Sequence, residues 1–212
     1  MPHRSDDESP QYDERRIEIL SLPEAVRKRP TMYLGSTDQR AHLLAAVLEG
    51  LLWHYRALQT PLNQVTICLE QDGSATMTCQ GSTLSETFLE QSAQILLRDL
   101  QSTFRQTPLL VIANALCERL SVTVRGLGNQ WRSFLFEQGI LRGDELCRIP
   151  LPEVCDLCLR LWPDFTVLDP GAFDYEGTRE AMHLGGHYMG DFSESFPTLT
   201  IIVTDARRLE SV

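Results

Sequence analysis

The 212-residue chain lacks any apolar run of the length that crosses a bilayer, which takes about 18 consecutive residues. Its first ten residues, MPHRSDDESP, contain no apolar core of the kind that signal peptides have. We therefore expect no membrane segment and a cytoplasmic location.

Positive charge is also scarce, with 19 Lys and Arg against 29 Asp and Glu and a net charge of −10. A broad nucleic-acid surface depends on cations that neutralise phosphates, so we expect no direct nucleic-acid binding. The run Arg27-Lys28-Arg29 is interpreted as a solvated helix face rather than a nucleic-acid contact.

In a cytoplasmic protein, six cysteines indicate free thiols rather than disulfides. Cys155 and Cys158, together with His183 and His187, have the spacing of zinc ligands. Residues 154–162 alternate like a strand, however, and this would place the two cysteines on opposite faces. We interpret the four residues as packing cysteines and loop histidines, and we expect no metal site.

An apolar fraction of 42% and a charged fraction of 23% are typical of a globular protein. We expect residues 1–16 to form a partly mobile N-terminal arm, because they are polar and charged. Residues 17–212 are predicted to form a single domain.

The stretch at residues 43–58, LLAAVLEGLLWHYRAL, organises this domain. Its apolar residues recur at steps of three and four, which predicts a helix with one buried face. Ala45, Glu49, Gly50 and Arg56 are expected on the other side. The buried stripe is Leu43, Leu44, Val47, Leu48, Leu51, Leu52, Tyr55 and Leu58.

Further elements flank this helix. A helix with Pro23 in its first turn is predicted to end before Pro30 and to be followed by a loop. The order of helices and strands predicts an α+β fold, a two-layer α/β sandwich with helices packed on one face of a mixed sheet. The other predicted elements are a hairpin at 65–69 and 75–79, helices at 88–104 and 109–120, and strands at 121–125, 130–137, 155–162 and 199–204; residues 163–197 are left unassigned.

The run LPEAVRKRPTMYLGSTD, residues 22–38, closely resembles the start of the ATPase domain of bacterial gyrase B and topoisomerase IV subunits. These proteins are members of the GHKL superfamily, with the Bergerat ATP-binding fold. The resemblance covers roughly residues 12–207 and implies the same fold. It continues at Tyr12-Asp13 and Ile17, His42, Gln71 to Ser74, Ala113 to Leu120, Trp131-Arg132, Leu159 to Asp164 and Leu199 to Arg207.

The chemistry of the family is missing from the central helix. The family has a glutamate there as general base and, four residues later, an asparagine that ligates magnesium. Ala46 and Gly50 stand at these positions, and neither can supply such a group. Glu49 is adjacent to Gly50, but one residue turns it about 100° around the helix, so we expect it to be a poor substitute.

The adenine contact is altered as well. The family has an aspartate that accepts a hydrogen bond from the adenine amino group, and Cys79, at best a weak acceptor, replaces it. Gly81 is retained, whereas a supporting threonine is replaced by Leu157. No glycine-rich stretch lies between Gly81 and Asn114, so we expect a shortened ATP lid.

The resemblance therefore implies a vestigial pocket, which we define as Ala46, Gly50, Cys79, Gly81 and Leu157. We predict a pseudo-ATPase with no catalytic residue, no ATP or magnesium cofactor and no metal. Trp53 lies off the apolar stripe and is interpreted either as a core aromatic or as a filler of this pocket.

Three functions remain open at this stage. In the family the N-terminal arm crosses to the other protomer, and Tyr12 and Ile17 have the matching spacing. The first hypothesis is a non-hydrolysing binding or regulatory module that acts through protein contact, as a homodimer or with a gyrase-type subunit. The alternative is a fragment of an ATP-binding type II DNA topoisomerase subunit that retains nucleotide binding. A third is a pocket for another small ligand, with Cys79 and Gln80 as polar contacts.

Overall fold

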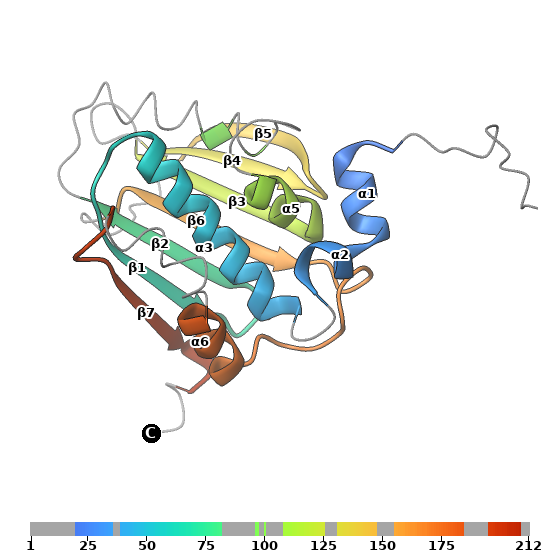
Figure 1. The fold of residues 1–212 in the computed structure, drawn as a ribbon. Coiled ribbons are helices and arrows are strands. Elements are labelled where there is room, and N and C mark those ends of the chain that lie inside the picture. Colours follow the sequence, from blue (N-terminus) through green and yellow to red (C-terminus); the bar gives the residue numbers. More distant parts are fainter. Residues whose placement is uncertain are drawn as a thin grey trace, which may run out of the picture.

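A seven-stranded sheet carries the long helix α3 (Gln39–Ala57) across one face, with α5 (Pro108–Leu116) and α6 (Tyr175–Leu184) beside it (Figure 1). The computed structural model describes residues 20–35, 39–81, 96–97, 100, 108–125, 131–147, 155–184 and 195–208. The remaining elements are α1 (Leu22–Lys28), α2 (Pro30–Leu34), β1 (Leu62–Leu69), β2 (Ala75–Gly81), β3 (Cys117–Arg125), β4 (Trp131–Glu137), β5 (Ile140–Cys147), β6 (Leu157–Pro163), β7 (Thr200–Asp205) and the 3₁₀ helix η4 (Ala206–Arg208).

The strands follow the order β5-β4-β3-β6-β2-β1-β7. β1 and β7 are parallel, and the other neighbouring pairs are antiparallel. The mixed sheet with helices on one face confirms the predicted α+β sandwich. The hairpin of β1 and β2 is confirmed too, with Leu69 opposite Ala75 next to the turn.

α3 supplies much of the core between the helices and the sheet. Its predicted stripe from Leu43 to Tyr55 is buried, with Leu43, Leu44, Leu51 and Leu52 fully inaccessible. Gly50, however, is buried as well, although the pattern places it on the solvent side. The reason is that α3 packs against α5 and α6 in addition to the sheet.

The first helix begins where the sequence predicts. Ser21 accepts a hydrogen bond from the Glu24 N–H while the Glu24 carboxylate accepts one from the Ser21 N–H, which is a capping box. The predicted loop after Pro30 is wrong, because Pro30 opens the short helix α2. Proline suits the first turn of a helix, and only Arg29, with φ at −141°, separates α1 from α2.

The predicted helix at 109–120 is too long. α5 ends at Leu116, and Cys117 to Leu120 belong to β3. Leu116 and Leu120 have helical spacing, but pairing of β3 with β4 and β6 satisfies the backbone of this stretch instead. Tertiary pairing overrides the local pattern here.

Two elements have no counterpart in the sequence prediction. β5 follows a two-residue turn in which Gln138 and Gly139 both have positive φ, at 52° and 86°. That geometry is the type I′ hairpin turn that a residue–glycine pair favours. α6 begins after Asp174, whose carboxylate accepts a hydrogen bond from the Gly177 N–H at 2.5 Å, as an N-cap does.

Several predictions fall outside the described residues. These are the arm at residues 1–16 with Tyr12 and Ile17, and most of the helix predicted at 88–104. In that helix Leu96 and Leu100 are described, and both are buried in the core. In the described part of the chain, no helix is long and apolar enough to span a membrane.

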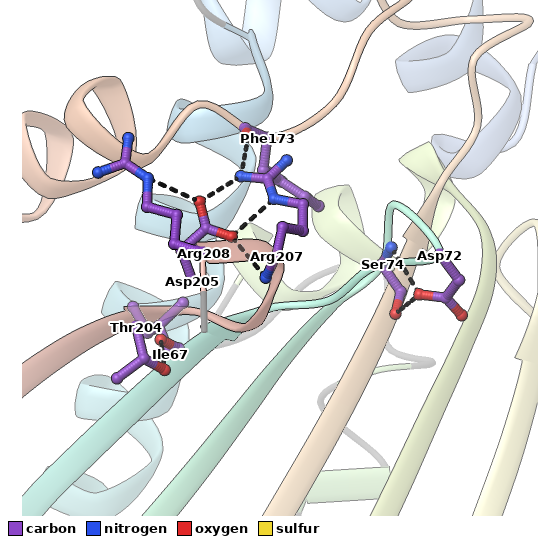
Figure 2. Close-up of polar contacts among 8 residues, drawn as sticks. All are labelled: Ile67, Asp72, Ser74, Phe173, Thr204, Asp205, Arg207 and Arg208. Carbon is purple, nitrogen blue, oxygen red and sulfur yellow. Dashed lines mark hydrogen bonds and ion pairs between the residues drawn. The ribbon is translucent and has the colours of Figure 1, made fainter. Parts of the chain in front are cut away.

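Two of the stretches that carry the family resemblance are held by carboxylates (Figure 2). In the turn of the β1–β2 hairpin, Asp72 accepts hydrogen bonds from the Ser74 N–H and hydroxyl. After β7, Asp205 pairs with Arg207 at 2.7 Å and with Arg208 at 3.4 Å. Arg207 also donates to the Phe173 carbonyl and so ties the end of the sheet to the segment before α6.

The run Arg27-Lys28-Arg29 is only in part the solvated face that was predicted. Arg27 pairs with Asp164 at 2.6 Å and donates to the Ala115 carbonyl at 3.0 Å. The Asp164 side chain is 4% exposed. Arg27 thus fastens α1 to the ends of α5 and β6.

We expect Arg27→Ala to lower the free energy of unfolding by about 1–3 kcal/mol, because Asp164 would keep a buried charge without its partner. Arg27→Lys should recover only part of the loss, since an ammonium cannot reproduce both hydrogen bonds. Urea denaturation measures the change. The exposed Arg29→Ala is the control, and an equal effect of both alanine variants would contradict the assignment.

Candidate functional site

The region of the vestigial pocket on α3 is packed with the chain's own side chains. Gly50 faces Leu110 of α5, which is 1% exposed. A Cβ on Gly50 would lie 2.6 Å from Leu110 Cγ and 2.9 Å from its Cδ2. Leu110 therefore occupies the space that any side chain at position 50 would need.

The other pocket residues meet where β2 and β6 pair. Cys79 lies opposite Leu157 in the ladder. Just beyond, the Asp156 N–H donates to the Cys79 carbonyl at 3.0 Å, and the Gly81 N–H donates to the Asp156 carboxylate at 2.7 Å. A Cβ on Gly81 would lie 2.9 Å from the Pro61 carbonyl oxygen, so the backbone itself closes on this glycine.

Buried polar groups surround this closed end. The Tyr55 hydroxyl hydrogen-bonds the Cys79 thiol, and burial raises the pKa of both groups well above their ordinary values. Burial also raises the pKa of Cys155 to about 11. The pKa of Asp156 is raised by burial, although the Gly81 hydrogen bond and the charge of Arg125 act in the opposite direction. Thiols with raised pKa are poor nucleophiles at neutral pH.

Ala46 lies apart from these residues, on the wall of a cavity of about 390 Å³. Glu49 lines the same cavity, so the structure places this carboxylate near Ala46 rather than near the strand residues. Burial raises the pKa of Glu49, and a hydrogen bond from the Trp53 side chain opposes that shift.

The structure thus brings together three of the five predicted pocket residues, Cys79, Gly81 and Leu157. Gly50 is covered by Leu110, and Ala46 opens onto the cavity. Both placements of Trp53 are wrong, because its side chain is 38% exposed beneath the Arg56 guanidinium. Leu110 fills the space near Gly50 instead.

The sequence does not reveal the residues that close the pocket. Leu110 is one of several apolar residues in α5, and nothing in the helical pattern distinguishes it. Asp156 directly precedes β6, where an acidic residue beside a predicted strand is an available signal. Tyr55 is part of the apolar stripe, so its buried hydroxyl is hidden by the core prediction.

The described residues contain no group of three or more His, Cys, Asp or Glu that could hold a metal ion. Cys155 and Cys158 are free thiols, the first just before β6 and the second within it. The His183 side chain and His187 lie outside the described residues.

Known proteins with similar sequences are the B subunits of type II topoisomerases. The chain is 28% identical over 187 residues to the gyrase B protein of Haloferax volcanii, an alignment that covers 78% of this chain and 29% of the relative. The corresponding values for the gyrase B protein of Micrococcus luteus are 26% over 187 residues, covering 80% and 26%. The B protein of DNA topoisomerase 4 from Mycoplasma capricolum is 40% identical over 76 residues, covering 35% and 12%. These proteins are homologues of the chain.

The fold comparison agrees with the sequences. The crystal structure of the gyrase B protein from Myxococcus xanthus matches with a TM-score of 0.64 and 22% identity, over 89% of this chain and 54% of that chain. The fold is therefore that of a GHKL-type α/β sandwich, as the resemblance implies. A search of protein families found no profile that matches the chain. The chain spans less than a third of the length of the gyrase relatives it matches.

Restoring the family's asparagine tests the packing at Gly50. We expect Gly50→Asn to lower the free energy of unfolding by about 1–3 kcal/mol, because the new side chain overlaps Leu110. Leu110→Ala alone leaves a void and costs about 2–5 kcal/mol. The double variant should be at least about 1 kcal/mol more stable than the sum of the two effects predicts. Ala45→Asn, on the half-buried face of α3, controls for helix propensity; strictly additive effects would contradict the contact.

The raised pKa of Asp156 predicts a pH-dependent effect of Asp156→Asn. A carboxyl whose folded pKa is raised contributes stability at low pH that is lost as the pH rises through that pKa. The variant should therefore gain stability relative to the wild type between acid and neutral pH. Asp205→Asn is the control with the opposite sign, because hydrogen bonds from Arg207 lower the pKa of Asp205. Parallel pH profiles for the two variants would contradict the assignment.

Proposed function

We propose that this gyrase-B-type domain is a pseudo-ATPase that neither hydrolyses nor binds ATP and that acts through contact with another protein. The observation that carries the proposal is the contact of Gly50 with Leu110, at the place where the family's magnesium ligand stands. A glycine offers no ligand, and Leu110 leaves no space for one.

The other pocket positions support the same conclusion. Ala46 cannot take a proton from water, and general-base catalysis accounts for about 100- to 10,000-fold in rate. Cys79 is fully buried and hydrogen-bonded to Tyr55, and Asp156 is bonded to Gly81. These residues do not fit adenine or a magnesium-bound triphosphate, so we assign no step of hydrolysis to them.

Glu49 is the residue on which the alternative depends. It lies in the cavity beside Ala46, and a carboxylate there could serve a nucleotide-binding topoisomerase fragment. However, the described residues that line the cavity include no Lys or Arg to offset phosphate charge, and Glu49 would repel it. We therefore favour the pseudo-ATPase.

The third hypothesis, a ligand held by Cys79 and Gln80, receives no support. Side chains alternate along β2, so Cys79 faces the core while Gln80 lies on the other side of the sheet. Protein contact is the remaining role, either between two copies or with a gyrase-type subunit, as the homology makes plausible.

Two measurements on the full chain separate the hypotheses. Calorimetric titration with a non-hydrolysable ATP analogue and magnesium should give no binding at millimolar concentration, and micromolar affinity would favour the topoisomerase fragment. Light scattering, with and without a gyrase B protein, should show a dimer or a mixed complex. We expect Tyr12→Ala in the arm to weaken that association, whereas the exposed Phe165→Ala should not. A strictly monomeric protein that ignores the gyrase B protein would contradict the role in protein contact.

A further inference from the structure

The cavity beside Ala46 has features that the proposed function does not use. Its volume of about 390 Å³ is within the range of small-molecule sites. Four helices surround it: α2 contributes Tyr33, α3 contributes Ala46, α5 contributes Leu109, and α6 contributes Met182. The walls are therefore mostly apolar and belong to the folded core of the domain.

Polar groups lie along one wall of this cavity. His42, Ala46 and Glu49 all line it and are spaced by four and three residues on α3, so they share one face of the helix. At 1.5 Å per residue, His42 and Glu49 are about 10 Å apart along the helix axis. The His42 Nδ1 lies 2.6 Å from the Leu34 carbonyl oxygen, which can only accept, so Nδ1 carries a proton and the ring is fixed.

Glu49 sets the charge of the cavity. It is half-buried, and the Trp53 side chain hydrogen-bonds its carboxyl group. None of the lining residues described is Lys or Arg, so the protein supplies no counter-charge within this space. A half-buried carboxylate in apolar surroundings favours a cationic ligand and disfavours an anionic one.

We propose that this cavity binds a small elongated amine, with its apolar body between α3 and the side chains of Leu109 and Met182 and its ammonium group on Glu49. The site is independent of the protein-contact role proposed above. An arylalkylamine matches both the length of the polar wall and the apolar volume better than a compact ammonium ion does.

Three probes with one carbon skeleton test the proposal on the full chain: phenylbutylamine, phenylbutanol and phenylbutyrate. Affinities are measured by protein-observed NMR titration at neutral pH. We expect the amine to bind at least about five-fold more tightly than the alcohol and at least about twenty-fold more tightly than the acid, as a charge-assisted hydrogen bond implies. Nα-acetyl-lysine methylamide distinguishes a lysine side chain of a partner protein from a free amine, and it should bind at least about five-fold more weakly than phenylbutylamine.

Two variants locate the binding. Glu49→Gln should remove the preference for the amine over the alcohol while leaving the affinity for the alcohol within about two-fold. Ala45→Leu adds bulk at the half-buried wall and should weaken amine and alcohol alike by at least about five-fold. Glu176→Gln, an exposed position at the start of α6, is the matched control and should change neither affinity.

The proposal is overturned if the wild type binds none of the probes at millimolar concentration, or if it binds the amine and the acid equally. It is also overturned if Glu49→Gln retains the full amine preference, or if the lysine derivative binds more tightly than phenylbutylamine. NMR spectra of each variant, with the dispersion of the wild type, establish that the fold is intact. Failure here leaves the ATP and light-scattering results unaffected, so the two proposals fail separately.

Discussion

The close approach of α3 and α5 at Gly50 is the contact on which the architecture of this domain depends. Because Gly50 has no side chain, Leu110 can enter the space beside the helix and join a continuous apolar core. α5 then leads directly into β3, one of the inner strands of the sheet. The same replacement that removes a possible metal ligand also allows the two helices to pack, so loss of chemistry and gain of core are linked.

A second closure lies at the junction of β2 and β6. Here the ladder brings Cys79 opposite Leu157, and Asp156 caps the end by bonding to Gly81. Burial of Tyr55 and Cys79 adds a hydrogen bond between two groups whose ionisation is strongly disfavoured. This end of the domain is therefore neutral and closed. The cavity beside Glu49 is acidic and partly apolar, and this contrast is why we propose ligands of opposite charge to nucleotide phosphate.

Sequence reasoning predicted the layers, the central helix and the β1–β2 hairpin, because each has a strong local pattern. It failed where two patterns compete. The spacing of Leu116 and Leu120 fits a helix, yet Leu120 pairs within the sheet. β5 was missed although Gln138 and Gly139 form a hairpin turn, since the strand they introduce has no clear alternation.

The site was predicted less completely than the fold. Substitutions at Ala46, Gly50 and Cys79 could be read against the family because they are changes of residue type at known positions. What replaces the missing groups depends on contacts between distant segments, such as Gly50 with Leu110 and Gly81 with Asp156. No spacing rule in a single sequence encodes such pairs, so the exposed Trp53 was wrongly considered as the filler.

An experimental structure of the full chain, crystallised with magnesium and a non-hydrolysable ATP analogue, tests the central claim most directly. The account predicts Leu110 in contact with Gly50, the Asp156 carboxylate bonded to the Gly81 N–H, and no nucleotide between α3 and the β2–β6 ladder. A bound nucleotide in that space, with Leu110 displaced from Gly50, would contradict it.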